Sequence, residues 1–250
     1  MTAPGAPPVR LSSTGAYALS KSQMGADGLN RTDPPPHRMK RNDPIVFWMG
    51  AAFAIALALT GATFAVIGID IVQALRLTAR WSFLLFWLAY AGGAMATLFG
   101  PTFKPIAIRA RELGLAYAAA QLVHLGLVVW LFQVSSRPPL SGKPFAFFMV
   151  AVVWTYLLAV FSFGGIAKTL GSRSWRALRI VGVNYILLAF AWDFVPAAFH
   201  STADYGVRRL AEYTPFAAMC IAAPLLVLLA AANRRLGMRY SSARLGQVAS

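Results

Sequence analysis

Few residues of this chain could do chemistry away from water, and two of them are ionisable. His124 lies about eleven residues into an uncharged run (113–136), and Asp193 lies about fourteen residues into another (180–203). Counted from one side of a membrane at ~1.5 Å per residue, their depths differ by ~4 Å, so the side chains are expected to meet. The carboxylate would stabilise a protonated imidazole or fix its tautomer. The expected polar cluster comprises Gln121, His124, Asn184, Tyr185 and Asp193.

His124 admits three interpretations. It could form a structural hydrogen bond between helices, serve as an axial ligand to a haem iron, or transfer protons or bind substrate. A haem held between helices needs a histidine from each of two neighbouring spans at similar depth. His200 lies seven residues beyond Asp193, more than ~10 Å from the level of His124. An axial pair of His124 and His200 is therefore not expected.

The elements that must position these residues are long apolar runs. Each has the ~20 residues that cross ~30 Å of hydrocarbon as a helix. Only Asp193 interrupts them with a charge. The runs are 44–69, 81–103, 113–136, 144–167, 180–203 and 213–233. The sequence therefore predicts an all-α membrane protein, with a bundle of six transmembrane helices over residues 44–235.

Composition excludes several functional classes. Hydrophobic residues make up 58% and charged residues 12% of the chain, whereas soluble domains have ~25% charged residues. Six spans with short loops leave no room for a soluble catalytic domain. The net charge of +15 is spread over tails and loops, a pattern that indicates lipid headgroups as partners and not nucleic acid. The single cysteine, Cys220, excludes an internal disulfide and a cysteine-ligated cluster.

The two ends of the chain differ from its centre. Residues 1–43 are rich in Pro, Gly, Ser and Thr, which predicts a disordered tail. No short apolar signal core precedes the first span, so that span is expected to be an uncleaved anchor. Residues 236–250 are expected to form a short tail. Of the 23 lysines and arginines, 17 fall on the side of both termini and 6 on the other. Both termini are therefore predicted to be cytoplasmic, and the Ala- and Arg-rich composition indicates a bacterial inner membrane.

Two features between the spans carry further expectations. Small residues, among them Gly61, Gly68, Gly92-Gly93 and Gly164-Gly165, favour close approach of helices. The segment 71–79 is too apolar for an ordinary loop. It is expected to extend the first helix or to lie in the outer interface of the membrane.

Short motifs carry a resemblance to a known family. Thr78-Ala-Arg-Trp81 precedes the second span, Arg111-Glu-Leu-Gly114 opens the third and leads to Leu122-Val-His124, and Leu170–Arg179 opens the fifth. Over roughly residues 45–235 this layout resembles the ferric-reductase-like transmembrane domain. It is most similar to the haem-binding membrane subunits of bacterial methionine-sulfoxide reductase systems. The resemblance implies transmembrane electron transfer through haem b for a partner oxidoreductase subunit, with His124 as an iron ligand.

The chain departs from that family in its fifth span. Arg179 and Trp192 stand where the family has histidines, and neither side chain ligates iron usefully. The implied outcomes are a five-coordinate haem on His124, a haem completed by a partner subunit, or a degenerate protein without haem. The alternative is a haem-free transporter or assembly subunit with a structural His124–Asp193 pair. No acid–base or nucleophile set indicates an enzyme, and if the chain is one, it is a membrane oxidoreductase subunit.

Overall fold

The computed structural model describes residues 43–135, 142–162, 171–199 and 206–248, with side chains for 44–135, 142–162, 171–199 and 211–236. Every long element in these ranges is an α-helix, and six of the helices are long and apolar enough to cross a membrane. The expected all-α fold with six membrane-spanning helices is therefore confirmed. The tail 1–43 lies almost wholly outside the described residues, as does His200.

The first two spans are joined by a tight turn. α1 (Asp43–Ile67) ends at Gly68, whose φ of 86° is a left-handed conformation that glycine adopts without strain. Asp70 then caps α2 (Ile71–Phe99), its Oδ1 accepting a hydrogen bond from the Gln73 backbone N at 3.0 Å. The segment 71–79 thus begins the second helix. The expectation that it extends the first helix is wrong, because the cap starts a new helix there; the alternative, a position in the outer interface, stays a prediction.

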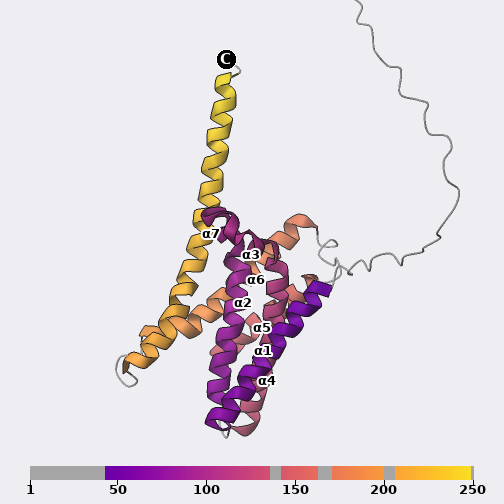
Figure 1. Cartoon of the computed structure of the whole chain (residues 1–250), viewed down its shortest axis with the longest axis vertical. Helices are drawn as coiled ribbons and strands as arrows, with labels where there is room; N and C mark the ends of the chain where they lie inside the picture. The colour runs from indigo at the N-terminus through magenta and orange to yellow at the C-terminus, as the bar shows by residue number, and fades with distance from the viewer. Residues whose placement is uncertain (1–42, 136–141, 163–170, 200–205, 249–250) are drawn as a thin grey trace, which may run out of the picture. The chain divides into compact units, whose positions relative to one another are not determined.

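The first three spans pack together along one another. After α2, a 3-10 turn η1 (Pro101–Phe103) and the short α3 (Lys104–Ile108) lead into α4 (Ala110–Val134). The most extensive helix contacts in the protein are those of α4 with α2 and with α1 (Figure 1). Fully buried small residues line these contacts and let the backbones approach. They are Ala56, Ala74, Ala116 and Ala120.

The glycines take a smaller part in this packing than expected. A Cβ added at Gly92 would lie 2.8 Å from Cγ2 of Ile106 in α3, so Gly92 is needed for close contact. A Cβ at Gly61 would have no heavy atom within 4 Å, and Gly68 serves the turn. For these two glycines the expected packing role is wrong, because alanines occupy the contact face. Gly164-Gly165 lies outside the described residues.

The last three spans continue the bundle. α5 (Gly142–Ser162) packs on α6 (Ser172–Phe199), and α6 packs on α7 (Gly206–Val248), which also contacts α2. The apolar part of α7 runs from Ala211 to Leu236. The helix continues to Val248, where a short tail of residues 236–250 was expected.

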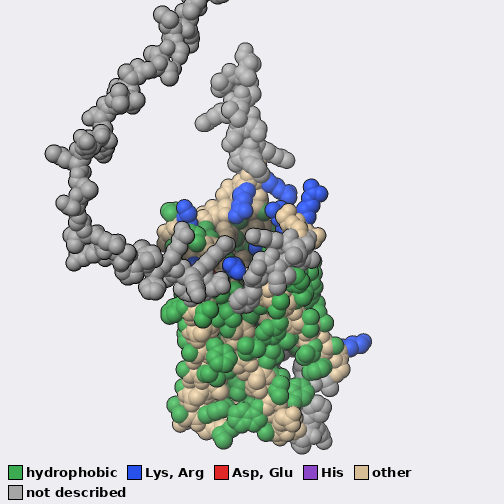
Figure 2. Space-filling model, turned by 90° about the vertical axis from the view of Figure 1, so that its right-hand side faces the viewer, with side chains coloured by type: hydrophobic (Ala, Val, Ile, Leu, Met, Phe, Trp, Pro, Cys, Tyr) green, Lys and Arg blue, Asp and Glu red, His purple; other side chains and the backbone are tan. Residues whose placement is uncertain are grey.

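The surface of the bundle suits a bilayer. Large apolar side chains such as Val153, Leu188 and Leu228 are more than half exposed, as lipid-facing residues are. Figure 2 shows hydrophobic side chains along the length of one face and most of the visible lysines and arginines gathered at one end. The protein is thus a multi-pass integral membrane protein in contact with lipid.

Candidate functional site

His124 lies near the middle of its span and faces α2. At ~1.5 Å per residue it is about 21 Å from the first residue of α4 and about 15 Å from the last. Its ring is half-buried, and Nδ1 lies 3.1 Å from Oγ1 of Thr78. Thr78 itself is fully buried. An imidazole in the middle of a span is therefore held by the neighbouring helix.

The hydrogen bonds of Thr78 define the state of the imidazole. Its hydroxyl, which has one hydrogen, donates to the carbonyls of Ala74 at 2.9 Å and Leu75 at 3.1 Å. When this hydrogen goes to either carbonyl, Oγ1 can accept from the ring, an arrangement that corresponds to the tautomer with its hydrogen on Nδ1 of His124. In the neutral imidazole this leaves the lone pair on Nε2. Nε2 is thus the ring atom that could accept a proton or bind an electrophile.

Two further polar side chains lie at the same contact. Ser82 follows Thr78 by one turn, and Gln121 precedes His124 by one turn. Oγ of Ser82 and Oε1 of Gln121 are buried without a hydrogen-bond partner in the described part of the chain. We call Thr78, Ser82, Gln121 and His124 the polar seam. Orphaned polar atoms inside a membrane protein are costly, so the seam is the strongest candidate for a functional site.

Helix register places the two orphaned atoms at one level. α2 and α4 run antiparallel, as two contacts between them show. Thr78 lies opposite His124. Two turns further along α2, the ring centroid of Phe86 lies 5.4 Å from that of Tyr117. Ser82 lies midway between the α2 members of these two pairs, and Gln121 lies midway between the α4 members. Ser82 and Gln121 therefore lie at one level, at a depth where lipid offers no polar contact.

The expected pairing of His124 with Asp193 is not formed. The imidazole bonds to Thr78, and no hydrogen bond or ion pair joins it to Asp193 among the described residues. Asp193 is exposed on α6 and close enough to Cys220 of α7 to interact with it electrostatically. The reason lies in helix rotation: α6 turns Phe190 and Phe194 inward, which directs Asp193 away from α4.

The expected five-residue polar cluster is likewise divided. Only Gln121 and His124 share the seam. Asn184, an exposed residue of α6, donates from Nδ2 to the Ile180 carbonyl at 2.7 Å, and its Oδ1 accepts from the Tyr90 hydroxyl at 2.9 Å. The Tyr185 hydroxyl donates to the Phe147 carbonyl of α5 at 3.2 Å. These groups link helices, and they do not reach His124.

Aromatic rings fill the space between α2, α4 and α6. Phe83 lies 5.1 Å from both Phe190 and Phe194, and Tyr117 lies 6.1 Å from Phe190. Offset and edge-to-face contacts at such distances are favourable and densely packed. The aromatic cluster consists of Phe83, Phe86, Tyr117, Phe190 and Phe194, and four of the five are buried.

The described residues of the fifth span offer no second histidine for a haem shared with His124. The aromatic cluster lies between the third and fifth spans. At the two ligand positions of the fifth span, Arg179 is exposed, and Trp192 is 60% exposed with its ring 5.6 Å from Phe147 of α5. Neither side chain is directed at α4. The described residues also contain no group of three or more His, Cys, Asp or Glu that could hold a metal ion.

No family model, curated protein or solved structure matches this chain. The resemblance to the ferric-reductase-like domain therefore rests on the chain's own short motifs, and it stays a prediction.

One polar cluster was not anticipated from the sequence. Nη2 of Arg80 lies 3.3 Å from Oε2 of Glu212, and the guanidinium stands over the rings of Tyr213 at 5.2 Å and Phe216 at 5.5 Å. Nε of Arg80 is buried without a partner in the described part of the chain. A signal existed in the sequence: each charge adjoins an aromatic residue at the start of an uncharged run (81–103 and 213–233), and these two starts were expected on the same side of the membrane.

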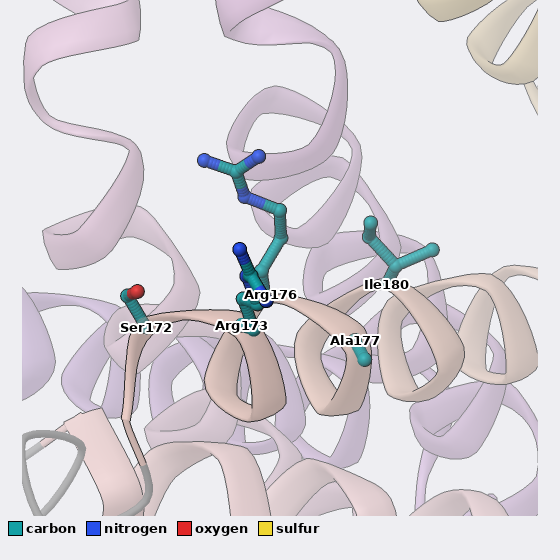
Figure 3. Close-up of a pocket in the computed structure, with 5 residues that line it drawn as sticks. All are labelled: Ser172, Arg173, Arg176, Ala177 and Ile180. Atoms are coloured by element: carbon teal, nitrogen blue, oxygen red, sulfur yellow. The ribbon is translucent and has the colours of Figure 1, made fainter.

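A pocket of about 420 Å³ opens at the start of α6. It is lined by Ser172, Arg173, Arg176, Ala177 and Ile180, and both arginine side chains rise from the same side of the helix (Figure 3). These arginines are exposed and lie at the end predicted to be cytoplasmic. Anionic lipid headgroups would be attracted there.

Proposed function

We propose that this chain is a haem-free membrane protein in which His124 is an intramembrane proton acceptor, serving proton handling or transport of a small polar solute. The observation that carries the proposal is the Thr78–His124 hydrogen bond, which holds the imidazole against α2 and is compatible with the Nδ1–H tautomer, in which Nε2 carries the lone pair. A positioned imidazole with a free lone pair suits proton uptake near neutral pH. Competing electron transfer through a haem with two histidine ligands would require a second histidine that the described residues of the fifth span do not supply.

Three polar residues lie on the face of α2 that leads from one end of the bundle to His124. Asp70, Thr78 and Ser82 are spaced by multiples of four residues, with the buried Ala74 between Asp70 and Thr78. Asp70 lies at the turn between α1 and α2, about 12 Å along the helix from Thr78. This end is the predicted external side. A proton or small polar solute would reach the seam from there.

The opposite end of the seam is closed. Beyond Ser82 and Gln121 the contact continues with Phe86 and Tyr117, both buried. The Tyr117 hydroxyl is paired with Oγ1 of Thr155 at 3.0 Å, so it offers no unused group to the seam. The polar side chains of the seam thus end at buried aromatic residues on this side. This supports binding and uptake from one side.

The proposal includes an orientation and a location. The lysine and arginine distribution places both termini in the cytoplasm, and the membrane is a bacterial inner membrane by composition. Figure 2 agrees with a charge asymmetry between the two ends of the bundle.

Nitrogen-15 NMR of the protein in lipid bilayers tests the proposal directly. The chain has three histidines, so a His37→Gln, His200→Gln background leaves His124 as the sole imidazole. We expect the neutral Nδ1–H tautomer and proton uptake on acidification. The midpoint should fall in Gln121→Leu, because Oε1 is the acceptor nearest in register to stabilise the charged ring. Thr78→Val should mix the tautomers, whereas Thr60→Val, whose hydroxyl bonds only its own helix at Ala56, should not.

An absorbance spectrum separates this function from electron transfer. Protein purified after expression with ample haem should show no Soret band. A Soret band that disappears in His124→Ala would overturn the proposal and establish His124 as a haem ligand. A neutral Nε2–H tautomer would also overturn it, since the acceptor would then be the wrong nitrogen.

A further inference from the structure

Asp193 lies deep in the hydrocarbon region. Its neighbour Phe194 packs on Phe83 with ring centroids 5.1 Å apart. Phe83 is twelve residues beyond the first residue of the 29-residue α2, or about 18 Å along that helix. Asp193 is therefore at the level of the middle of α2. A carboxyl group at this depth is far from the headgroups at either side.

The carboxyl group is also on the outer surface of the bundle. Asp193 is exposed, as is its neighbour Trp192. Asp193 makes no hydrogen bond or ion pair with any described residue. A charged carboxyl group in contact with lipid at mid-membrane is unfavourable, so a basic group placed against it would lower that cost.

We infer that the α6 face around Trp192 and Asp193 docks a transmembrane helix of another protein that carries a lysine or arginine at mid-membrane. A cation satisfies the carboxylate and cancels the burial cost of both charges. Trp192 offers a large flat surface beside it for the stem of the basic side chain. This inference is independent of the role proposed for His124.

A second copy of this chain does not offer the required cation. Among the described basic groups near this depth, Arg80 is engaged by Glu212 and two aromatic rings. Arg76 lies seven residues nearer the end of α2 than Phe83, or about 10 Å away in depth. His124 is bonded in the seam. The partner's charge must therefore come from a different chain.

Synthetic transmembrane peptides test the inference with defined probes. The full chain, with a fluorophore at its carboxyl terminus, is reconstituted in phosphatidylcholine vesicles with a labelled Leu-rich helix whose central residue is Lys, Leu or Asp. Energy transfer should show that the Lys peptide binds at least about tenfold more tightly than the Leu peptide. Asp193→Glu should keep this preference. Asp193→Asn, which retains hydrogen bonding without charge, should abolish it.

A relocated carboxyl group provides the matched control. In Asp193→Leu combined with Ile221→Asp, the acid moves to an exposed position of α7, and the Lys preference should not return. Its return would show that any surface carboxyl suffices and would overturn the docking site. Equal binding of the three peptides to the unsubstituted chain, or self-association that depends on Asp193 without a Lys preference, would also overturn it.

Discussion

Oγ1 of Thr78 lies 3.1 Å from Nδ1 of His124 and joins two spans whose residues are 46 positions apart in the sequence. The threonine is fully buried, and its hydroxyl also returns two bonds to its own helix. The pair thus joins α2 to α4 and, at the same time, orients the imidazole. Structure and chemistry depend here on the same hydroxyl.

Thr78→Val should therefore weaken the α2–α4 contact. Valine has nearly the same shape and removes only the hydroxyl, so we expect a loss of about 1 kcal/mol in free energy of unfolding, typical of one hydrogen bond between membrane helices. Reversible unfolding in mixed micelles would measure it. Thr60→Val is the control, because the Thr60 hydroxyl bonds only the Ala56 carbonyl of its own helix. Equal losses in both variants would show that the bond to His124 contributes nothing.

Ser82→Ala and Gln121→Leu should have the opposite effect on stability. Each removes a buried atom without a partner, so each should raise the unfolding midpoint, with a gain of up to about 1 kcal/mol. Proton uptake by His124 should become weaker in the same variants, as expected when a site trades stability for function. Thermal denaturation followed by circular dichroism would measure the first effect. A clear loss of stability in both variants would mean that these atoms are satisfied in the membrane.

The six spans were readable from the sequence because the bilayer imposes a local requirement. A run of ~20 apolar residues identifies a helix without knowledge of its neighbours. The partner of His124 was not readable in this way. Thr78 lies in the segment 71–79, which was expected outside the second span, so the one residue that bonds the imidazole was not considered. The cap at Asp70, which places Thr78 inside α2, is a local signal that could have corrected this.

Depth alone also failed to predict contact. His124 and Asp193 do lie at similar levels, within two turns of α2 as judged from Thr78 and Phe83. Contact requires in addition that both helices turn the residues toward each other. The rotation of α6 is determined by its buried aromatic side chains, Phe194 among them, and a single sequence does not show which side of an almost wholly apolar helix faces the bundle.

Arg80→Ala should destabilise the contact between α2 and α7. The Arg80 and Glu212 side chains are 15% and 31% exposed, so the charges are partly shielded from solvent, and removal of the guanidinium also removes its contacts with two rings. We expect a loss of about 1–3 kcal/mol. The stability of Arg80→Lys should lie between those of the unsubstituted protein and Arg80→Ala, because lysine keeps the charge but cannot stack on the rings as the planar guanidinium does.

The control for this prediction is Arg76→Ala on the same helix. Arg76 has no hydrogen bond or ion pair with a described residue, so its loss should change the unfolding free energy little. Unfolding by sodium dodecyl sulfate in mixed micelles would compare the three variants. An Arg80→Ala protein as stable as Arg76→Ala would show that the ion pair and the ring contacts contribute nothing net.

Gly92→Ala should lower the stability of the protein, whereas Gly93→Ala should raise it. The added methyl at position 92 meets Cγ2 of Ile106 at 2.8 Å, with the Ile106 backbone behind it at 3.5 Å, so α3 must move. At position 93 nothing lies within 4 Å, and alanine gains about 1 kcal/mol of helix propensity. We expect Gly92→Ala to lose about 1 kcal/mol net and Gly93→Ala to gain stability. Parallel melting curves would decide, and a stabilised Gly92→Ala would show that α3 is not packed on α2.

The orientation can be tested by fusion at the carboxyl terminus. Seventeen of the 23 basic residues lie on the predicted cytoplasmic side, but the loops between spans contribute to both sides almost equally, so the tails carry much of the asymmetry. A green fluorescent protein fused after Ser250 should therefore be fluorescent in bacteria, and an alkaline phosphatase fused there should be inactive. Replacing the basic residues of 1–43 with glutamine should lower the fluorescent fraction, because the remaining loops specify orientation weakly. An active phosphatase fusion on the unaltered chain would reverse the topology and would place the turn at Asp70, and with it the opening of the polar seam, on the cytoplasmic side.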